Sequence, residues 1–276
     1  MTILPMFLDD QHLRVGGVDF HCHYQWNNDD EVEPEGFLPV AKSRDQVERY
    51  LRLQKSMPAE VIVEIGIYRG GSTALLHALF QPRRLVAIEL ASEPAAALSA
   101  YIHRHGLDEV IRPHYGINQA DRDGVAAIMA AELAGRPVDL VIDDASHLLH
   151  ETRAAFETLF PRLRPGGLYV IEDWNADHLV ADHFDTILAD SSTPDHDALA
   201  HTLGLAATMQ PVPDPRLVRL PLELVLARAR KGDVIREVTV MENWVVIQRG
   251  EQPIDPREFR LSDLVKDHFA NLRAIG

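Results

Sequence analysis

The sequence has a single cysteine, Cys22, no long apolar run and too few basic residues to balance its acidic ones. One cysteine cannot form an intrachain disulfide, which favours a reducing compartment. No stretch approaches the roughly 18 apolar residues of a membrane-spanning helix, and the N-terminus lacks a basic start followed by an apolar core. Because 27 Lys and Arg face 42 Asp and Glu, the net charge is −15, which argues against nucleic-acid binding. We therefore expect a cytoplasmic protein with a small-molecule partner, no nucleic-acid partner and no membrane association.

Two acidic strand ends are the most informative feature that is present. The apolar runs 140–142 and 168–171 are separated by a helical segment, and each is followed by two acidic residues. In a βαβ unit the strands are parallel, so both carboxyl ends open at one edge of the sheet, where open α/β folds bind ligands. The side chains that converge there are Asp143, Asp144, Glu172, Asp173 and His147. Oxygen ligands beside a base indicate metal-assisted removal of a proton from a hydroxyl.

A glycine turn follows an earlier apolar strand at residues 61–65. Glycines stand at 66, 70 and 71, just before a helical segment. They let a ligand approach the backbone and leave N–H groups free at the helix start, although packing alone explains such glycines equally well. Glu89 ends the next strand, 19 residues (89 − 70) after Gly70, where an acidic residue accepts both hydroxyls of a ribose. Together these features indicate a cofactor that contains a nucleoside.

A third strand, at residues 110–111, leads to further polar groups at the same sheet edge. Asn118, Gln119 and Asp121 follow it and are placed to read an adenine edge. Asp121 is an equally good N-cap for the helix that comes next. Similarly, His21 and His23 around Cys22 suggest a metal site, but the second ligand pair of a zinc site is missing.

The chain as a whole predicts a single α/β domain over residues 1–276. Turn formers in residues 1–42 predict an irregular segment, and Ser43 with Gln46 forms a capping box at the start of a helix. We divide the chain into an N-terminal cap (1–57), a cofactor-binding core (58–175), a helical acceptor or lid insertion before strand 6 (176–232), a terminal antiparallel hairpin (233–250) and a C-terminal helix (251–276). The insertion predicts helices near 177–190, 195–208 and 214–230.

Five βα units followed by a hairpin form the layout of the class I S-adenosylmethionine-dependent methyltransferases. The segments 64–66 (Glu-Ile-Gly) and 70–72 (Gly-Gly-Ser) resemble their cofactor loop. The segment 143–147 (Asp-Asp-Ala-Ser-His), with 163–167 (Leu-Arg-Pro-Gly-Gly) and 172–173 (Glu-Asp), resembles the metal-dependent branch. That branch includes the macrolide deoxysugar O-methyltransferases and the cephalosporin hydroxylase-like proteins. The resemblance covers about residues 60–175 and the hairpin, and it implies a doubly wound, Rossmann-like sheet of seven strands.

The resemblance also implies roles for individual residues. S-adenosylmethionine would be bound at its methionine end by Glu64, Gly66, Ser72 and Asp143, at its ribose by Glu89 and at its adenine by Gln119. Asn118 stands where the family has Asp. The ligands of Mg²⁺ would be Asp144, Glu172 and Asp173. A divalent ion lowers the pKa of an alcohol, and His147 with Asp144 would form the catalytic pair, with His147 as the base.

Alternatives remain for two of these side chains and for the function. His147 is alternatively a cap for the helix after it, and Trp174 either stacks on a sugar or packs in the core. We predict an O-methyltransferase that acts on a sugar hydroxyl of a natural-product deoxysugar or of a methylated mannose-type oligosaccharide. A catechol or phenol O-methyltransferase of the same fold, and a noncatalytic S-adenosylmethionine-binding subunit, are the alternatives. We also expect a homo-oligomer.

Overall fold

A seven-stranded sheet forms the centre of the protein in the computed structural model, which describes residues 5–23, 36–176 and 216–265. The strands lie in the order β10-β11-β9-β8-β5-β6-β7. Their bounds are Val61–Ile65 (β5), Arg84–Ile88 (β6), Ile111–His114 (β7), Val138–Asp143 (β8), Leu163–Glu172 (β9), Ile235–Val240 (β10) and Trp244–Arg249 (β11). The predicted doubly wound α/β fold with seven strands is confirmed.

The strands of the central sheet are parallel in the core and antiparallel in the terminal hairpin, as the sequence predicts. Strands β5 to β9 pair in parallel, and β5 is buried along its whole length because helices cover both faces of the sheet. The predicted terminal hairpin is confirmed, since β10 and β11 are antiparallel and β11 adds antiparallel to β9. The chain runs outward from β5 in one direction through β6 and β7, and in the other through β8 and β9. Neighbours β5 and β8 therefore form the switch point where open α/β sheets bind ligands.

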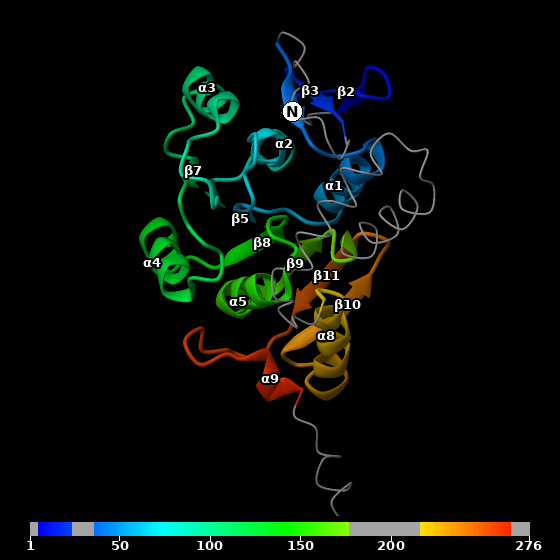
Figure 1. Cartoon of the computed structure of the whole chain (residues 1–276), viewed down its shortest axis with the longest axis vertical. Coiled ribbons are helices and arrows are strands. Elements are labelled where there is room, and N and C mark those ends of the chain that lie inside the picture. Colours follow the sequence, from blue (N-terminus) through cyan, green and yellow to red (C-terminus); the bar gives the residue numbers. More distant parts are fainter. Residues whose placement is uncertain (1–4, 24–35, 177–215, 266–276) are drawn as a thin grey trace, which may run out of the picture.

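Among the described residues, three helices pack on each face of the sheet, and Figure 1 shows helices on both sides of it. On one face lie α1 (Arg44–Ser56), α2 (Gly71–Phe80) and α3 (Ala96–His105), and on the other α4 (Arg122–Leu133), α5 (Leu149–Leu159) and α8 (Arg219–Arg230). A 3₁₀ turn (Phe160–Arg162) follows α5, and α9 (Leu261–Leu264) packs on α8. Ser43 and Gln46 form the predicted capping box of α1. None of the helices within the described ranges has the length and apolarity to cross a membrane.

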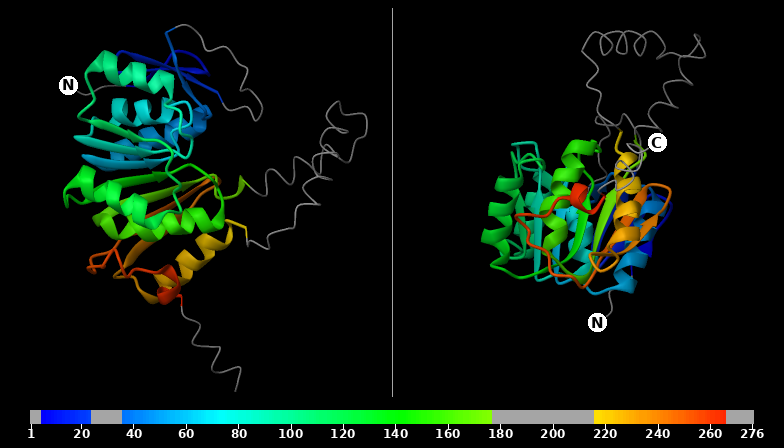
Figure 2. Two further views of the ribbon diagram at one scale, coloured as in Figure 1. Left: turned by 60° about the vertical axis from the view of Figure 1, so that its left-hand side comes forward. Right: turned by 90° about the horizontal axis from the view of Figure 1, so that it is seen from below.

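The expectation of an irregular segment at residues 1–42 is wrong. Within its described part the chain forms a four-stranded sheet of β1 (Met6–Phe7), β2 (His12–Val15), β3 (Val18–Cys22) and β4 (Leu38–Val40), which lies beside α2 (Figure 2). Alternate residues Leu13 and Val15 are buried, as are Phe20 and Cys22, so a period-two pattern was present. It is hard to recognise because the strands are short and β4 pairs with β3 only after a long connection.

One glycine allows this small sheet to lie against the core. A Cβ atom at position 71 would stand 1.6 Å from the carbonyl oxygen of Pro39 in β4. Only glycine lets β4 approach the first residue of α2 this closely, so Gly71 serves the packing of the N-terminal sheet. The chain leaves β4 at Val40 and enters α1 after Ser43, which brings the intervening Lys42 to the centre of the molecule.

Several predicted helices fall in part or wholly outside the described residues. The predicted helix near 214–230 corresponds to α8, Arg219–Arg230. The predicted helices near 177–190 and 195–208 lie outside the described residues, as do residues 266–276 of the predicted C-terminal helix at 251–276. In the described part of that segment, 251–265, the helix is limited to α9, so the prediction is wrong for residues 251–260.

Candidate active site

A cavity of about 420 Å³ opens at the carboxyl ends of the strands beside the switch point. Its volume falls in the range of small-molecule sites. Ile65, Gly66 and Tyr68 line it after β5, Glu89 to Ala91 after β6, Ile117 to Gln119 after β7, and Asp144 to Ser146 after β8, with Leu148 and Glu151. Three of the predicted cofactor residues, Gly66, Glu89 and Gln119, therefore line one cavity.

Glu89 holds the loop that follows β5. Its Oε2 accepts hydrogen bonds from the backbone N–H groups of Ile67 (2.9 Å) and Tyr68 (2.8 Å), and its Oε1 accepts one from Ala91 (2.9 Å). Burial opposes its charge, but these N–H groups outweigh burial and lower the pKa of Glu89. The carboxylate is therefore charged and fixed at the cavity wall, where its remaining lone pairs are available to a hydroxyl.

The other predicted cofactor residues, Glu64, Ser72 and Asp143, do not line the cavity. Glu64 is fully buried in β5 and accepts a hydrogen bond from the hydroxyl of Thr73. Asp143 is 2% exposed and accepts one from Tyr169 at 2.7 Å. Burial raises the pKa of both carboxyls to about 7, against the effect of Ser72 and Thr73 on Glu64 and of Tyr169 on Asp143. Their assignment to the methionine end of the cofactor stays a prediction.

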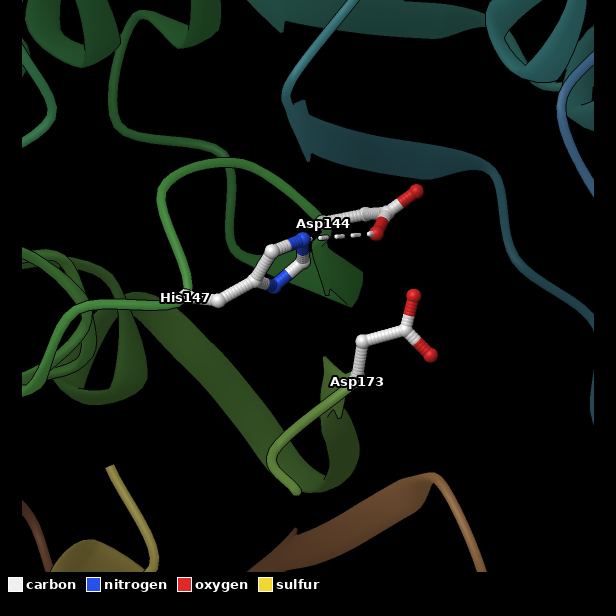
Figure 3. Close-up of side chains that lie close together, drawn as sticks. All are labelled: Asp144, His147 and Asp173. Carbon is white, nitrogen blue, oxygen red and sulfur yellow. Dashed lines mark ion pairs between the residues drawn. The ribbon is translucent and has the colours of Figure 1, made fainter. Parts of the chain in front are cut away.

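Asp144, His147 and Asp173 form the acidic cluster at the open side of the site (Figure 3). One ligand atom of each lies within 4.8 Å of the others, and Nε2 of His147 stands 3.9 Å from Oδ1 of Asp144. His147 and Asp173 have left-handed backbones, with φ of 54° and 49°. Non-glycine residues seldom adopt this conformation, and here it turns both side chains toward Asp144. The structure thus brings together three of the four predicted metal and catalytic residues.

Glu172, the fourth of these residues, does not belong to the cluster. It is completely buried, and its two carboxylate oxygens accept hydrogen bonds from Lys42 and from the hydroxyl of Tyr50. Adjacent residues of a strand point to opposite faces, so Glu172 and Asp173 diverge at the end of β9. A metal-ligand role for Glu172 stays a prediction.

Sequence reasoning missed three residues that organise the site. Lys42 donates to Oδ2 of Asp144 at 2.7 Å and to Oε2 of Glu172 at 2.8 Å, while Asn243 donates to Oδ1 of Asp173 at 3.1 Å. With Tyr50, they come from the N-terminal segment and from the turn between β10 and β11, far from the acidic strand ends in sequence. Burial would raise the pKa of Asp144, but Lys42 and His147 outweigh it and lower that pKa. No local motif marks these residues.

The structure distinguishes between the alternative roles of three side chains. Asp121 caps α4 by accepting a hydrogen bond from Gly124, and Trp174 packs against the core while donating to the carbonyl of Met241. Helix α5 has Leu148 as its N-cap and no side-chain cap, so His147 does not cap it. Among the described residues, the group that could hold a metal ion is the one at Asp144, and His21 and His23 belong to no such group.

The acidic cluster fits a divalent cation. Two carboxylates and one imidazole converge, and each carboxylate keeps one oxygen that is free of the bonds from Lys42 and Asn243. Carboxylate oxygens are the ligands that Mg²⁺ prefers, with water or a substrate hydroxyl completing its octahedron.

Comparison with known proteins identifies the core of this fold. A family model described as "Methyltransferase domain" matches residues 63–174, which include most of β5, all of β6 to β9 and every predicted cofactor, metal and catalytic residue. This part of the chain is similar to a methyltransferase domain.

Known relatives of the methyltransferase domain act on sugar-bearing natural products. A tetracenomycin rhamnosyl 3'-O-methyltransferase of Streptomyces olivaceus is 38% identical over 108 residues, which are 39% of this chain and 24% of that protein. A rhamnosyl tetracenomycin 2'-O-methyltransferase of the same organism is 52% identical over 54 residues, 20% of this chain and 14% of that protein. The chain thus matches less than a quarter of the length of either relative.

Solved structures that the chain resembles are more distant in sequence. One is the MycE methyltransferase of the mycinamycin pathway in complex with Mg, SAH and mycinamycin VI. It is 22% identical, the match covers 76% of this chain and 51% of that chain, and the TM-score is 0.47.

Proposed function

We propose that this protein is an S-adenosylmethionine- and Mg²⁺-dependent O-methyltransferase that acts on a sugar hydroxyl. One observation carries the proposal: Asp144 both lines the cavity and belongs to the acidic cluster. A cofactor in the cavity and a hydroxyl held at the cluster would therefore meet at a single residue. Positioning two reactants in this way is a large part of catalysis of group transfer.

Each group at the site has a part in this reaction. Glu89 and Gln119 line the cavity and would face the nucleoside of S-adenosylmethionine, which would supply the methyl group from its positively charged sulfur. Asp144 and Asp173 would hold Mg²⁺, which lowers the pKa of a hydroxyl that it binds. His147 stands beside them with its ring nitrogen toward Asp144, and it accepts the proton that the hydroxyl oxygen loses. The carboxylate of Asp144 stabilises the imidazolium that results.

The acceptor class is supported by the relatives and by the chemistry of the base. The two curated relatives are named as methyltransferases of rhamnosyl groups, whereas no relative named above acts on a mannose-type oligosaccharide. An alcohol needs both a metal and a base more than a phenol does, because its pKa is far higher. A catechol acceptor and a noncatalytic cofactor-binding role remain the alternatives. The predicted homo-oligomer stays a prediction.

The test combines binding with turnover. Calorimetric titration with S-adenosylmethionine should show one site, and absence of binding refutes the cofactor and with it the noncatalytic alternative. Transfer of a labelled methyl group should occur to rhamnosides with Mg²⁺ and stop in excess EDTA. Turnover of catechols alone would favour the phenol alternative, and cofactor binding without any turnover would favour the noncatalytic one.

A matched pair of variants separates the specific role of Asp144 from the general effect of losing one negative charge. Asp144→Asn should reduce methyl transfer at least 100-fold while cofactor binding largely survives. Asp123→Asn removes the same charge from the exposed first turn of α4 and should leave turnover unchanged. Equal activity of the two variants would refute the role of Asp144.

A further inference from the structure

Lys42 is a buried cation at the base of the acidic cluster. Its side chain is 3% exposed, and its ammonium lies 2.7 Å from Oδ2 of Asp144 and 2.8 Å from Oε2 of Glu172. The ring of Tyr50 stands 5.4 Å from the same nitrogen. A buried ammonium requires this set of partners, because its desolvation is offset only by close carboxylates and well-formed hydrogen bonds.

Glu172 is fully engaged by the protein itself. Lys42 binds one carboxylate oxygen and the Tyr50 hydroxyl binds the other, and the side chain has no exposed surface. Asp173, the next residue, turns the other way with φ of 49° and is held there by Asn243. The two neighbouring carboxylates therefore have different partners: Glu172 pairs with buried Lys42, and Asp173 belongs to the acidic cluster.

The two carboxylates of the cluster, Asp144 and Asp173, carry the two negative charges that balance one divalent ion. Glu172 adds a third negative charge and Lys42 offsets it, so the sum stays at two negative charges (3 − 1). Lys42 and Glu172 neutralise one another beneath the site, which leaves Asp144 and Asp173 to face the open side.

We propose that Lys42 is a positioning residue that acts as an internal cation. It holds Glu172 out of the metal coordination sphere and fixes one oxygen of Asp144, so that the divalent cation is bound by Asp144 and Asp173 beside His147. Glu172 is the counter-charge of Lys42. The inference rests on the proposed function, because it assumes that a cation binds at this cluster.

A cation bound between Asp144 and Glu172, in place of the Lys42 ammonium, would make a different prediction. If a cation displaces the ammonium and binds between Asp144 and Glu172, then Glu172 is as important to its affinity as Asp173. Removal of the ammonium strengthens cation binding in either arrangement, because a positive charge next to the site is lost, so the comparison of Glu172 with Asp173 is what discriminates between them.

The experiment measures Mn²⁺ affinity of the full chain without cofactor, by electron paramagnetic resonance titration. Asp173→Asn should weaken binding at least tenfold and Glu172→Gln by less than threefold. Lys42→Met should tighten binding at least threefold, whereas Lys55→Met, the same change on the exposed last turn of α1, should leave it unchanged. Equal losses in Glu172→Gln and Asp173→Asn, or weaker binding in Lys42→Met, overturn the inference.

A double variant guards against loss of folding in the single ones. Lys42→Met with Glu172→Gln removes both buried charges, and it should fold and bind Mn²⁺ within threefold of the wild type. A loss of tenfold or more in the folded double variant overturns the inference. If the wild type itself binds no Mn²⁺, the cation of the proposed function fails and the inference fails with it. If the wild type binds and only the variants disagree, the proposed function stands.

Discussion

Glu64→Gln should change how the stability of the protein depends on pH. Glu64 is fully buried in β5, and among the described residues its Oε1 has no hydrogen-bond partner. Burial raises its pKa from 4.5 to about 7. The acid is therefore neutral in the native state under conditions in which it is ionised in the unfolded state. A native pKa that is raised contributes stability that is complete below pH 4.5 and is lost as the pH rises through 7.

The magnitude follows from the two pKa values. Their difference is about 2.5 (7 − 4.5), and at 1.36 kcal/mol for each pKa unit it corresponds to about 3 kcal/mol of unfolding free energy. Because glutamine stays neutral, Glu64→Gln should lack this loss. Relative to its value at pH 4.5, the variant should therefore retain about 3 kcal/mol more stability than the wild type at pH 8.

Urea unfolding of the cofactor-free chain, followed by circular dichroism at intervals between pH 4.5 and pH 8, measures the effect. Glu109→Gln is the control, because Glu109 is exposed, and it should follow the wild-type curve. Parallel curves for Glu64→Gln and the wild type across this range would refute the reasoning, since they would show that Glu64 is ionised in the native state.

Further predictions concern the base, the packing of the N-terminal sheet and the buried carboxylate. His147→Gln and His147→Ala should each reduce kcat by roughly 10²–10⁴-fold, and near-normal kcat in both moves the role of base to another group. Gly71→Ala should destabilise the chain by at least ~2 kcal/mol in thermal unfolding, because its Cβ meets the carbonyl of Pro39 at 1.6 Å; an unchanged Tm contradicts this. Tyr50→Phe removes a hydroxyl bonded to buried Glu172 and should cost about 1–3 kcal/mol in urea unfolding, whereas a stability equal to the wild type shows that the bond contributes nothing.

The sequence alone was sufficient for the central sheet and for the location of the site. Apolar runs with acidic ends at Asp144 and Asp173, and the glycine after β5, predict parallel strands whose carboxyl ends coincide. This geometry holds for any parallel sheet, so residues 29 positions apart in the chain (173 − 144) could be placed together without a structure. The structure confirms the seven-stranded sheet and the shared edge.

The strands of the N-terminal segment were missed for a local reason. Leu13 and Val15 alternate with polar residues, but the runs are too short to outweigh the glycines and prolines around them. The parallel pairing of β3 with β4 joins residues on either side of a connection, and no pattern in the sequence specifies such a pairing.

The sequence by itself therefore determined which residue types reach the sheet edge. Parallel pairing brings the strand ends together, and the period of two along a strand sets which side chains share a face. Only the tertiary structure decided which of two adjacent acids joins the acidic cluster. Glu172 and Asp173 separate because the pleat and a left-handed φ turn them apart, and because Lys42, 130 positions away from Glu172, reaches its carboxylate. Contacts of that range depend on how a whole segment packs, and a local pattern of residues does not encode them.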